Sequence, residues 1–175
     1  MSTAPIHAAN PEELREVRFD AAMESQIAEL LTHYPIPRAA LLPVLWLCQK
    51  RYGWIAPGVM EAVAARLGLS PAYVQGVVTF YTMFHTTPPA RFVLQVCTTL
   101  SCAVCGAGEL LAHLRKRLGI GPGERTPDGT FQIVGVQCLG ACGSAPVVQV
   151  NDDYYENLDP AKLDALLDEL AAAKE

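Results

Sequence analysis

Five of the six cysteines lie in two short segments in the second half of the chain. The first segment holds Cys97, Cys102 and Cys105, and the second holds Cys138 and Cys142. Each segment follows a predicted β-strand, so the fold must accommodate two groups of thiols at two strand ends. Cys48 stands apart in an apolar run, where we expect a small buried hydrophobic residue. The grouping of the cysteines therefore constrains the fold more than any other feature.

The order of predicted elements brings the two groups together. Alternating apolar residues predict a strand over 91–96, and a nearly continuous apolar run predicts a central strand, buried on both faces, over 131–137. A predicted helix over 108–118 lies between them, and a strand–helix–strand crossover makes the two strands parallel. Their carboxyl ends then lie at one edge of the sheet. Cys97 and Cys138 directly follow these strands, so four thiols can converge from two adjacent loops.

The remaining periodicity completes an α+β fold. Helical spacing in the first half predicts four helices, and Ser70-Pro71 marks the start of the last of them. Two short strands, over 146–150 and around residues 154–155, precede a final helix that begins at Asp159-Pro160. We expect a flexible N-terminus over 1–18 and a helical bundle region over 19–86. A thioredoxin-like α/β domain is expected over 90–175.

Composition and charge exclude several classes of function. The net charge is −5 and no block of Lys and Arg is dense enough to follow phosphates, so we expect no nucleic acid partner. The longest apolar stretch, over 39–48, is too short to cross a membrane, and residues 1–10 lack the pattern of a signal peptide. We therefore expect an intracellular chain without direct membrane insertion. In that setting cysteines serve metal binding or redox chemistry.

The cysteine spacing alone favours a [2Fe–2S] cluster and leaves structural zinc as the alternative. The pairs are spaced C-x4-C and C-x3-C, which is at the loose end of the range for structural zinc. A [2Fe–2S] cluster has two irons, each held by two thiolates, and wider pairs suit it better. The four histidines are scattered, so a Rieske site with two histidine ligands is excluded.

Several segments resemble a known family along residues 20–170. They are RYGWIAP, VVTFYTMF, CTTLSC, LGIGPGERTPDG, CLGACGSAPVVQVND and YYENLDP. The sequence resembles the thioredoxin-like [2Fe–2S] ferredoxins, and within them the 24 kDa subunit family of NADH–quinone oxidoreductase (respiratory complex I). The resemblance implies one [2Fe–2S] cluster, with ligands Cys97, Cys102, Cys138 and Cys142.

The resemblance also implies a role and partners. Members of the family transfer single electrons beside a flavin- and NADH-binding subunit, so FMN and NADH are expected on that partner. Other peripheral-arm subunits of complex I are further expected partners. For a bacterial chain the expected location is cytoplasmic, peripheral on the inner face of the membrane through the complex. The chain itself is not expected to be catalytic in isolation, because Gly119–Gly123 forms a turn that lacks the pattern of a nucleotide-binding loop.

Cys105 is not part of the family's ligand pattern and opens two other interpretations. Cys97, Cys102 and Cys105 with a distant Cys138 also fit the spacing of plant-type ferredoxins, but that assignment leaves Cys142 unused. Cys102-Ala-Val-Cys105 before a helix fits a redox dithiol, but then three cysteines are idle. We expect Cys105 to be a non-ligand near the site.

Alternative functions follow from the same residues. A matching subunit of an NAD-linked hydrogenase or formate dehydrogenase would have much the same sequence. A zinc-stabilised interaction module and a thiol–disulfide oxidoreductase are candidates from other classes. We assign no catalytic acid, base or nucleophile, and we expect His113 to be solvated on an exposed helix face. Most aromatic residues of the helical half are expected in its core, with some forming a docking face.

Overall fold

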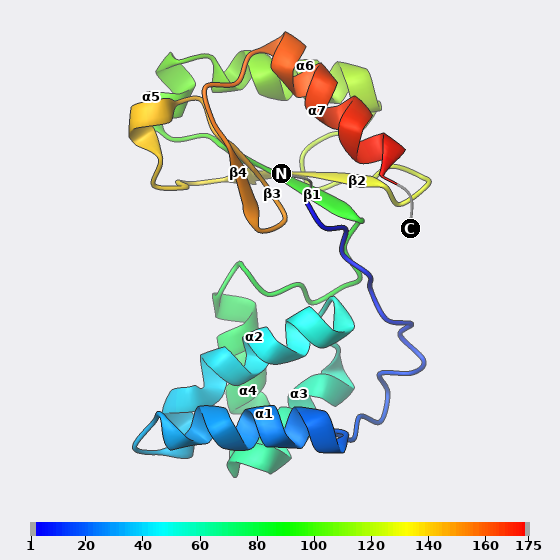
Figure 1. The fold of residues 1–175 in the computed structure, drawn as a ribbon, viewed down its shortest axis with the longest axis vertical. Coiled ribbons are helices and arrows are strands. Elements are labelled where there is room, and N and C mark those ends of the chain that lie inside the picture. Colours follow the sequence, from blue (N-terminus) through cyan, green and yellow to red (C-terminus); the bar gives the residue numbers. More distant parts are fainter. Residues whose placement is uncertain (1–2, 174–175) are drawn as a thin grey trace. The chain divides into compact units, whose positions relative to one another are not determined.

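The chain folds into two compact units. The computed structural model describes residues 3–173. The helical unit contains residues 7–88, and the α/β unit contains residues 89–173 together with residues 3–6 (Figure 1). Helices come first and a mixed sheet with helices follows, so the predicted α+β class is confirmed.

The helical unit is built from four α-helices around one apolar core. Helix α3 packs against both α2 and α4, and α1 packs against α2. The predicted cap at Ser70 is confirmed, since its side chain accepts a hydrogen bond from the Tyr73 backbone N–H. The elements are α1 (Ala21–Thr32), the 3₁₀-helix η1 (Pro37–Ala40), α2 (Leu41–Tyr52), α3 (Pro57–Leu67) and α4 (Pro71–Phe80).

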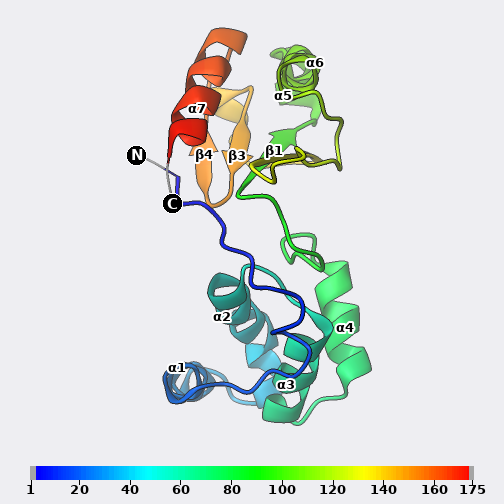
Figure 2. The same ribbon diagram turned by 90° about the vertical axis from the view of Figure 1, so that its right-hand side faces the viewer.

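The α/β unit is a four-stranded sheet in the order β2-β1-β3-β4. Strands β1 and β2 are parallel, whereas β3 is antiparallel to both β1 and β4. Helices α6 and α7 cover one face of the sheet, and their leucines share a core with Phe92 and Leu94 of β1 (Figure 2). The elements are β1 (Phe92–Cys97), α5 (Leu100–Val104), α6 (Ala107–Leu118), β2 (Phe131–Val136), the 3₁₀-helix η2 (Cys142–Ser144), β3 (Val148–Val150), β4 (Asp153–Tyr155) and α7 (Pro160–Ala172).

The position of β2 differs from the prediction. The apolar run over 131–137 predicted a central strand, but β2 is an edge strand and only Phe131 and Ile133 are buried in it. The central strand is β1, in which every residue except Gln95 is buried. Apolar composition indicated burial on both faces, but one face of β2 is only partly covered.

His113 is also placed differently from the prediction. Its Nε2 lies 2.8 Å from Oδ1 of Asp164, so the ring is paired across α6 and α7 and is half-buried. Arg117 adds a second link between the two helices, with its Nη2 2.7 Å from Oδ1 of Asp168. These acids therefore join two helices that are far apart in sequence.

Residues 3–6 make specific contacts with the α/β unit. The hydroxyls of Thr3 and Tyr155 are hydrogen-bonded at 2.6 Å, and Thr3 is buried. Asn151 donates its side-chain amide to the Ala4 carbonyl, and the Ile6 N–H donates to the Arg91 carbonyl. Residues 3–6 thus belong to the α/β unit, although its first strand begins only at Phe92.

The aromatic side chains of the helical unit differ in exposure. Trp54 and Phe84 are buried, and the Trp54 indole N–H donates to the Ala9 carbonyl. Phe80 is 76% exposed and Tyr81 is partly exposed at the end of α4. Trp54 and Phe84 therefore belong to the core, whereas Phe80 and Tyr81 lie at the surface of the unit. No helix within residues 3–173 is long and apolar enough to span a membrane.

Gly58 allows the segment before α1 to pass directly over the start of α3. A Cβ atom at this position would collide with the backbone carbonyl oxygens of Leu14 and Arg15. Those neighbours are backbone atoms and cannot rotate away. Gly76 in α4 is the opposite case, because a Cβ there would meet nothing within 4 Å.

We therefore expect Gly58→Ala to destabilise the helical unit by roughly 1–3 kcal/mol through overpacking. Gly76→Ala is the matched control and should stabilise it by about 0.5–1 kcal/mol, because alanine loses less backbone entropy in a helix. Both tryptophans, Trp46 and Trp54, lie in this unit. Urea unfolding followed by tryptophan fluorescence therefore reports its stability directly. Equal effects of the two substitutions would contradict the proposed close approach.

Candidate metal centre

The pairing of β1 with β2 places the first cysteine of each group at one edge of the sheet. In the parallel register Cys97 lies opposite Val136, the last residue of β2. Thr98 ties the strand ends together, since its backbone N–H and its hydroxyl both donate to the Val136 carbonyl at 2.9 Å. Cys138 follows two residues later, so it leaves the sheet beside Cys97.

The short helix α5 brings the chain back to the sheet edge at Cys97. No pattern in the sequence predicted this helix. It begins after Thr99 and turns Cys102 inward, whereas Leu100 and Val104 point to solvent. Cys97 and Cys102 are both buried and pack together with Ala107 and Val147. Five residues are too few for hydrophobic periodicity to be visible, so sequence offered no clear signal for this element.

The second loop carries Cys138 and Cys142 on a tight backbone. Gly140 has a φ of 78°, a left-handed conformation that favours glycine, and its N–H donates to Cys138 Sγ at 3.4 Å. The helix η2 then starts at Cys142, and the cis peptide bond Ala145–Pro146 leads into Val147. Cys138 and Cys142 are exposed, in contrast to Cys97 and Cys102.

Backbone N–H groups surround the sulfur of Cys97. Burial by itself raises the pKa of this thiol, but hydrogen bonds from the Thr99 and Leu139 N–H groups and from the thiols of Cys102 and Cys138 lower it below its ordinary value. The Cys97 thiol therefore loses its proton more easily than an ordinary thiol. A metal binds the thiolate and not the thiol.

The environment of Cys102 links it to the remaining cysteine. Burial raises the pKa of Cys102, the hydrogen bond to Cys97 and the charges of Cys97 and Cys142 raise it further, and the Val147 N–H opposes them. Each of the four predicted ligands thus interacts with at least one other. These interactions are pairwise, and within residues 3–173 no three His, Cys, Asp or Glu side chains form a ready site for a single ion.

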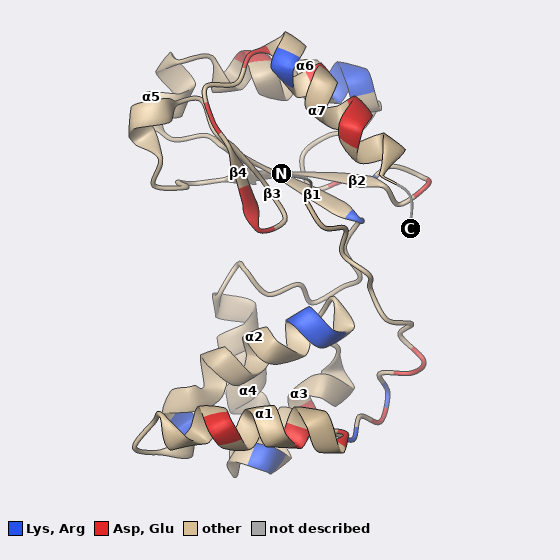
Figure 3. Cartoon of the chain, viewed as in Figure 1, with Lys and Arg blue, Asp and Glu red and all other residues tan. Residues whose placement is uncertain are grey.

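The two cysteine segments contain no charged side chain. No Lys, Arg, Asp or Glu occurs within residues 92–108 or 129–151, and α5 and its neighbouring loops are free of charge colours in Figure 3. Within these segments, peptide dipoles and no cations are available to balance negative charge on sulfur. Four thiols with directed N–H donors fit a group that is held by thiolates and carries excess negative charge.

The other two cysteines lie in different environments. Cys105 is exposed, as Cys138 and Cys142 are, and it forms the C-cap of α5. Cys48 is fully buried in α2 of the helical unit, as expected, and burial raises its pKa to about 12. At neutral pH Cys48 is therefore an inert thiol.

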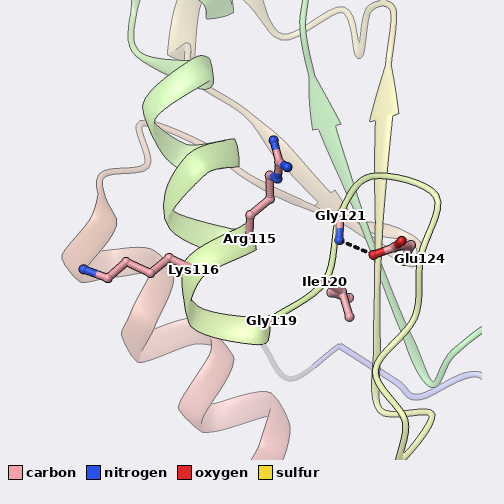
Figure 4. Close-up of a pocket in the computed structure, with 6 residues that line it drawn as sticks. All are labelled: Arg115, Lys116, Gly119, Ile120, Gly121 and Glu124. Carbon is pink, nitrogen blue, oxygen red and sulfur yellow. Dashed lines mark hydrogen bonds between the residues drawn. The ribbon is translucent and has the colours of Figure 1, made fainter.

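The glycine-rich segment after α6 is a turn, as predicted. The Gly121 N–H donates to a carboxylate oxygen of Glu124 at 2.6 Å, so the chain's own acid closes the loop (Figure 4). An open depression of about 470 Å³ lies here and includes Arg115 and Lys116. The Gly121 N–H is already hydrogen-bonded within the loop. The loop also follows a helix, whereas a dinucleotide-binding loop follows a strand.

A thioredoxin-like sheet with paired thiols at the ends of two parallel strands defines a class of small metal- or redox-active α/β proteins. Residues 27–171 match the thioredoxin-like [2Fe–2S] ferredoxin family. This match covers most of the chain, and the chain belongs to that family.

Two relatives are similar along most of their length. The chain is 49% identical over 152 residues to an NADH-quinone oxidoreductase subunit of Rhizobium meliloti, covering 87% of this chain and 90% of the relative. It is 46% identical over 151 residues to NADH-quinone oxidoreductase subunit 2 of Thermus thermophilus, covering 85% and 83%. The predicted family is therefore confirmed.

Solved structures include one that is similar in fold as well as in sequence. The NAD⁺-reducing [NiFe]-hydrogenase in its H₂-reduced state matches with a TM-score of 0.70 and 26% identity. The match covers 78% of this chain and only 23% of the hydrogenase chain, so it concerns one part of a longer polypeptide.

Alkylation tests the contrast between the two cysteines outside the predicted ligand set. We expect iodoacetamide at pH 8 to modify Cys105 in the folded protein at least ~100-fold faster than Cys48, because Cys48 is buried and protonated. Mass spectrometry of peptides after timed quenching measures both rates in one sample. Unfolding in urea should remove most of the difference. A fast reaction of Cys48 in the folded protein would contradict its place in the core.

Proposed function

We propose that this chain is the [2Fe–2S] electron-transfer subunit of an NADH–quinone oxidoreductase and that Cys97, Cys102, Cys138 and Cys142 hold its cluster. The observation that carries the proposal is the pairing of thiols at the ends of parallel strands, with backbone N–H groups directed at Cys97 and Cys138. The family and the relatives at 41–49% identity support the cofactor and the complex.

The chain's own residues prepare the thiols for this role. Two strand ends fix Cys97 and Cys138 side by side, α5 fixes Cys102, and η2 fixes Cys142. The N–H groups favour the thiolate at Cys97, which lowers the cost of releasing a proton on metal binding. The bound cluster supplies one-electron transfer, a chemistry that no protein side chain here offers.

A subunit of an NAD-linked hydrogenase is the second candidate. The structural similarity to the NAD⁺-reducing hydrogenase supports it. The site and its cluster would be the same, and only the partner complex would differ. The higher identity to the NADH–quinone oxidoreductase subunits favours the first candidate.

We further propose that α5 and the cysteine loops face the flavin- and NADH-binding subunit. Leu100 and Val104 of α5 are more than three-quarters exposed, although both are apolar. They lie two residues before and two residues after the buried Cys102, and no charged residue occurs within residues 92–108. Exposed apolar side chains of this kind gain free energy when a partner covers them. Such a partner would bring its FMN near the cluster, and other peripheral-arm subunits and the inner face of the membrane would be reached through it.

Substitution of single cysteines tests the ligand set. Cys142→Ser should abolish or severely alter the cluster, because it removes one of four thiolate ligands. Cys105→Ser is the matched control and should leave about two irons and two sulfides per chain and an unchanged visible spectrum. Iron and acid-labile sulfide analysis of anaerobically purified proteins measures both. Loss of the cluster in Cys105→Ser alone would establish plant-type ligation, and one zinc without sulfide in the unsubstituted protein would overturn the proposed function.

Reconstitution tests the partner surface. The purified chain should neither oxidise NADH nor have its cluster reduced by it, and adding the flavin-bearing subunit should bring about that reduction. Val104→Glu should weaken binding of this subunit by about tenfold or more, because a charge would be buried without a partner. Ile36→Glu changes an exposed apolar residue of the helical unit in the same way and should have little effect. Fast NADH oxidation by the chain alone would contradict the assignment.

A further inference from the structure

Tyr154 reaches from the edge of the sheet to the loop that carries two of the cysteines. It lies in β4, opposite Gln149 of β3, and its side chain is half-exposed. Its hydroxyl donates a hydrogen bond to the Leu139 carbonyl at 3.0 Å. Leu139 stands between Cys138 and Gly140, so this phenol contacts the backbone at the centre of the second cysteine loop.

The bonded carbonyl shares its peptide plane with the N–H group that faces Cys138. The Leu139 carbonyl and the Gly140 N–H belong to one planar trans peptide and point in opposite directions. The same N–H donates to Cys138 Sγ at 3.4 Å. A partner that fixes the carbonyl on one side therefore also fixes the direction of the N–H on the other.

This peptide plane has little else to hold it. Gly140 is in the left-handed region, with a φ of 78°, and a Cβ there would meet nothing within 4 Å. Crowding by neighbouring atoms thus does not restrain the loop at this point, and glycine has the widest choice of backbone conformations. A directed hydrogen bond is an effective restraint for such a segment.

We propose that Tyr154 is a positioning residue of the cysteine site, which holds the Gly140 N–H on Cys138 Sγ by fixing the Leu139 carbonyl. The inference rests on the proposed function, because its consequence concerns a cluster bound through Cys138. An N–H donor to a ligand sulfur stabilises the reduced state more than the oxidised state, since the reduced state places more negative charge on sulfur. Tyr154 therefore raises the reduction potential of the site.

The neighbouring tyrosine provides a matched control. Tyr155 lies on the same strand, but its hydroxyl bonds to that of Thr3, and successive side chains of a strand point to opposite faces. Tyr154→Phe and Tyr155→Phe each remove one hydroxyl from β4 and leave the ring in place. Only the first removes a hydrogen bond to the cysteine loop.

Redox titration followed by EPR spectroscopy tests the inference on the loaded full-length chain. Tyr154→Phe should keep its iron and sulfide content but show a reduced-to-oxidised ratio about threefold to tenfold lower at a fixed potential, where tenfold equals ~59 mV for one electron. Tyr155→Phe should keep the potential of the unsubstituted protein. Pulsed EPR after exchange into D₂O should show a weakened coupling to one exchangeable proton in Tyr154→Phe only.

Other results would contradict either this inference or the proposed function. An unchanged potential in Tyr154→Phe, or an equal fall in Tyr155→Phe, would overturn the inference. A Tyr154→Phe protein that cannot hold iron would also overturn it, because the tyrosine would then act on assembly of the site. If the unsubstituted chain holds no iron and sulfide, the proposed function itself fails, and that outcome is visible before any variant is titrated.

Discussion

The parallel pairing of β1 with β2 is the constraint on which the cysteine site depends. Parallel strands end at the same edge of a sheet, and the register that sets Cys97 opposite Val136 makes the two cysteine segments neighbours. Thr98 closes this edge with two hydrogen bonds to one carbonyl. A shift of one residue in this register would turn Cys97 to the other face of the sheet and separate the thiols.

The site uses backbone dipoles where many metal sites use charged side chains. The cysteine segments carry no Lys, Arg, Asp or Glu, and N–H groups of Thr99, Leu139, Val147 and Gly140 face sulfur atoms. Backbone donors are kept by every substitution except proline, and they are held by the fold itself. An uncharged rim with Leu100 and Val104 can also be covered by a partner without the desolvation of ions.

Much of this arrangement was predictable from the sequence. The rest was not predictable, and the reasons can be named for particular elements. The strand ends at Cys97 and Cys138 follow from strong periodicity, and the Ser70 and Asp159 caps follow from local chemistry. Helix α5 is too short to show a period. The edge position of β2 and the pairing of His113 with Asp164 depend on which elements meet in space. Likewise, nothing in a single tyrosine at position 154 indicates that it reaches Leu139.

The contacts of residues 3–6 make the α/β unit discontinuous in the chain. Thr3 bonds to Tyr155, a partner 152 residues later, and the whole helical unit lies between them in sequence. On the ribosome, Thr3 must therefore wait for the synthesis of Tyr155 before the two can meet. All of residues 7–88 have been synthesised by then, so the helical unit can fold before the sheet is closed. The N-terminal contact of the α/β unit thus forms late in synthesis, across a helical unit that is already present.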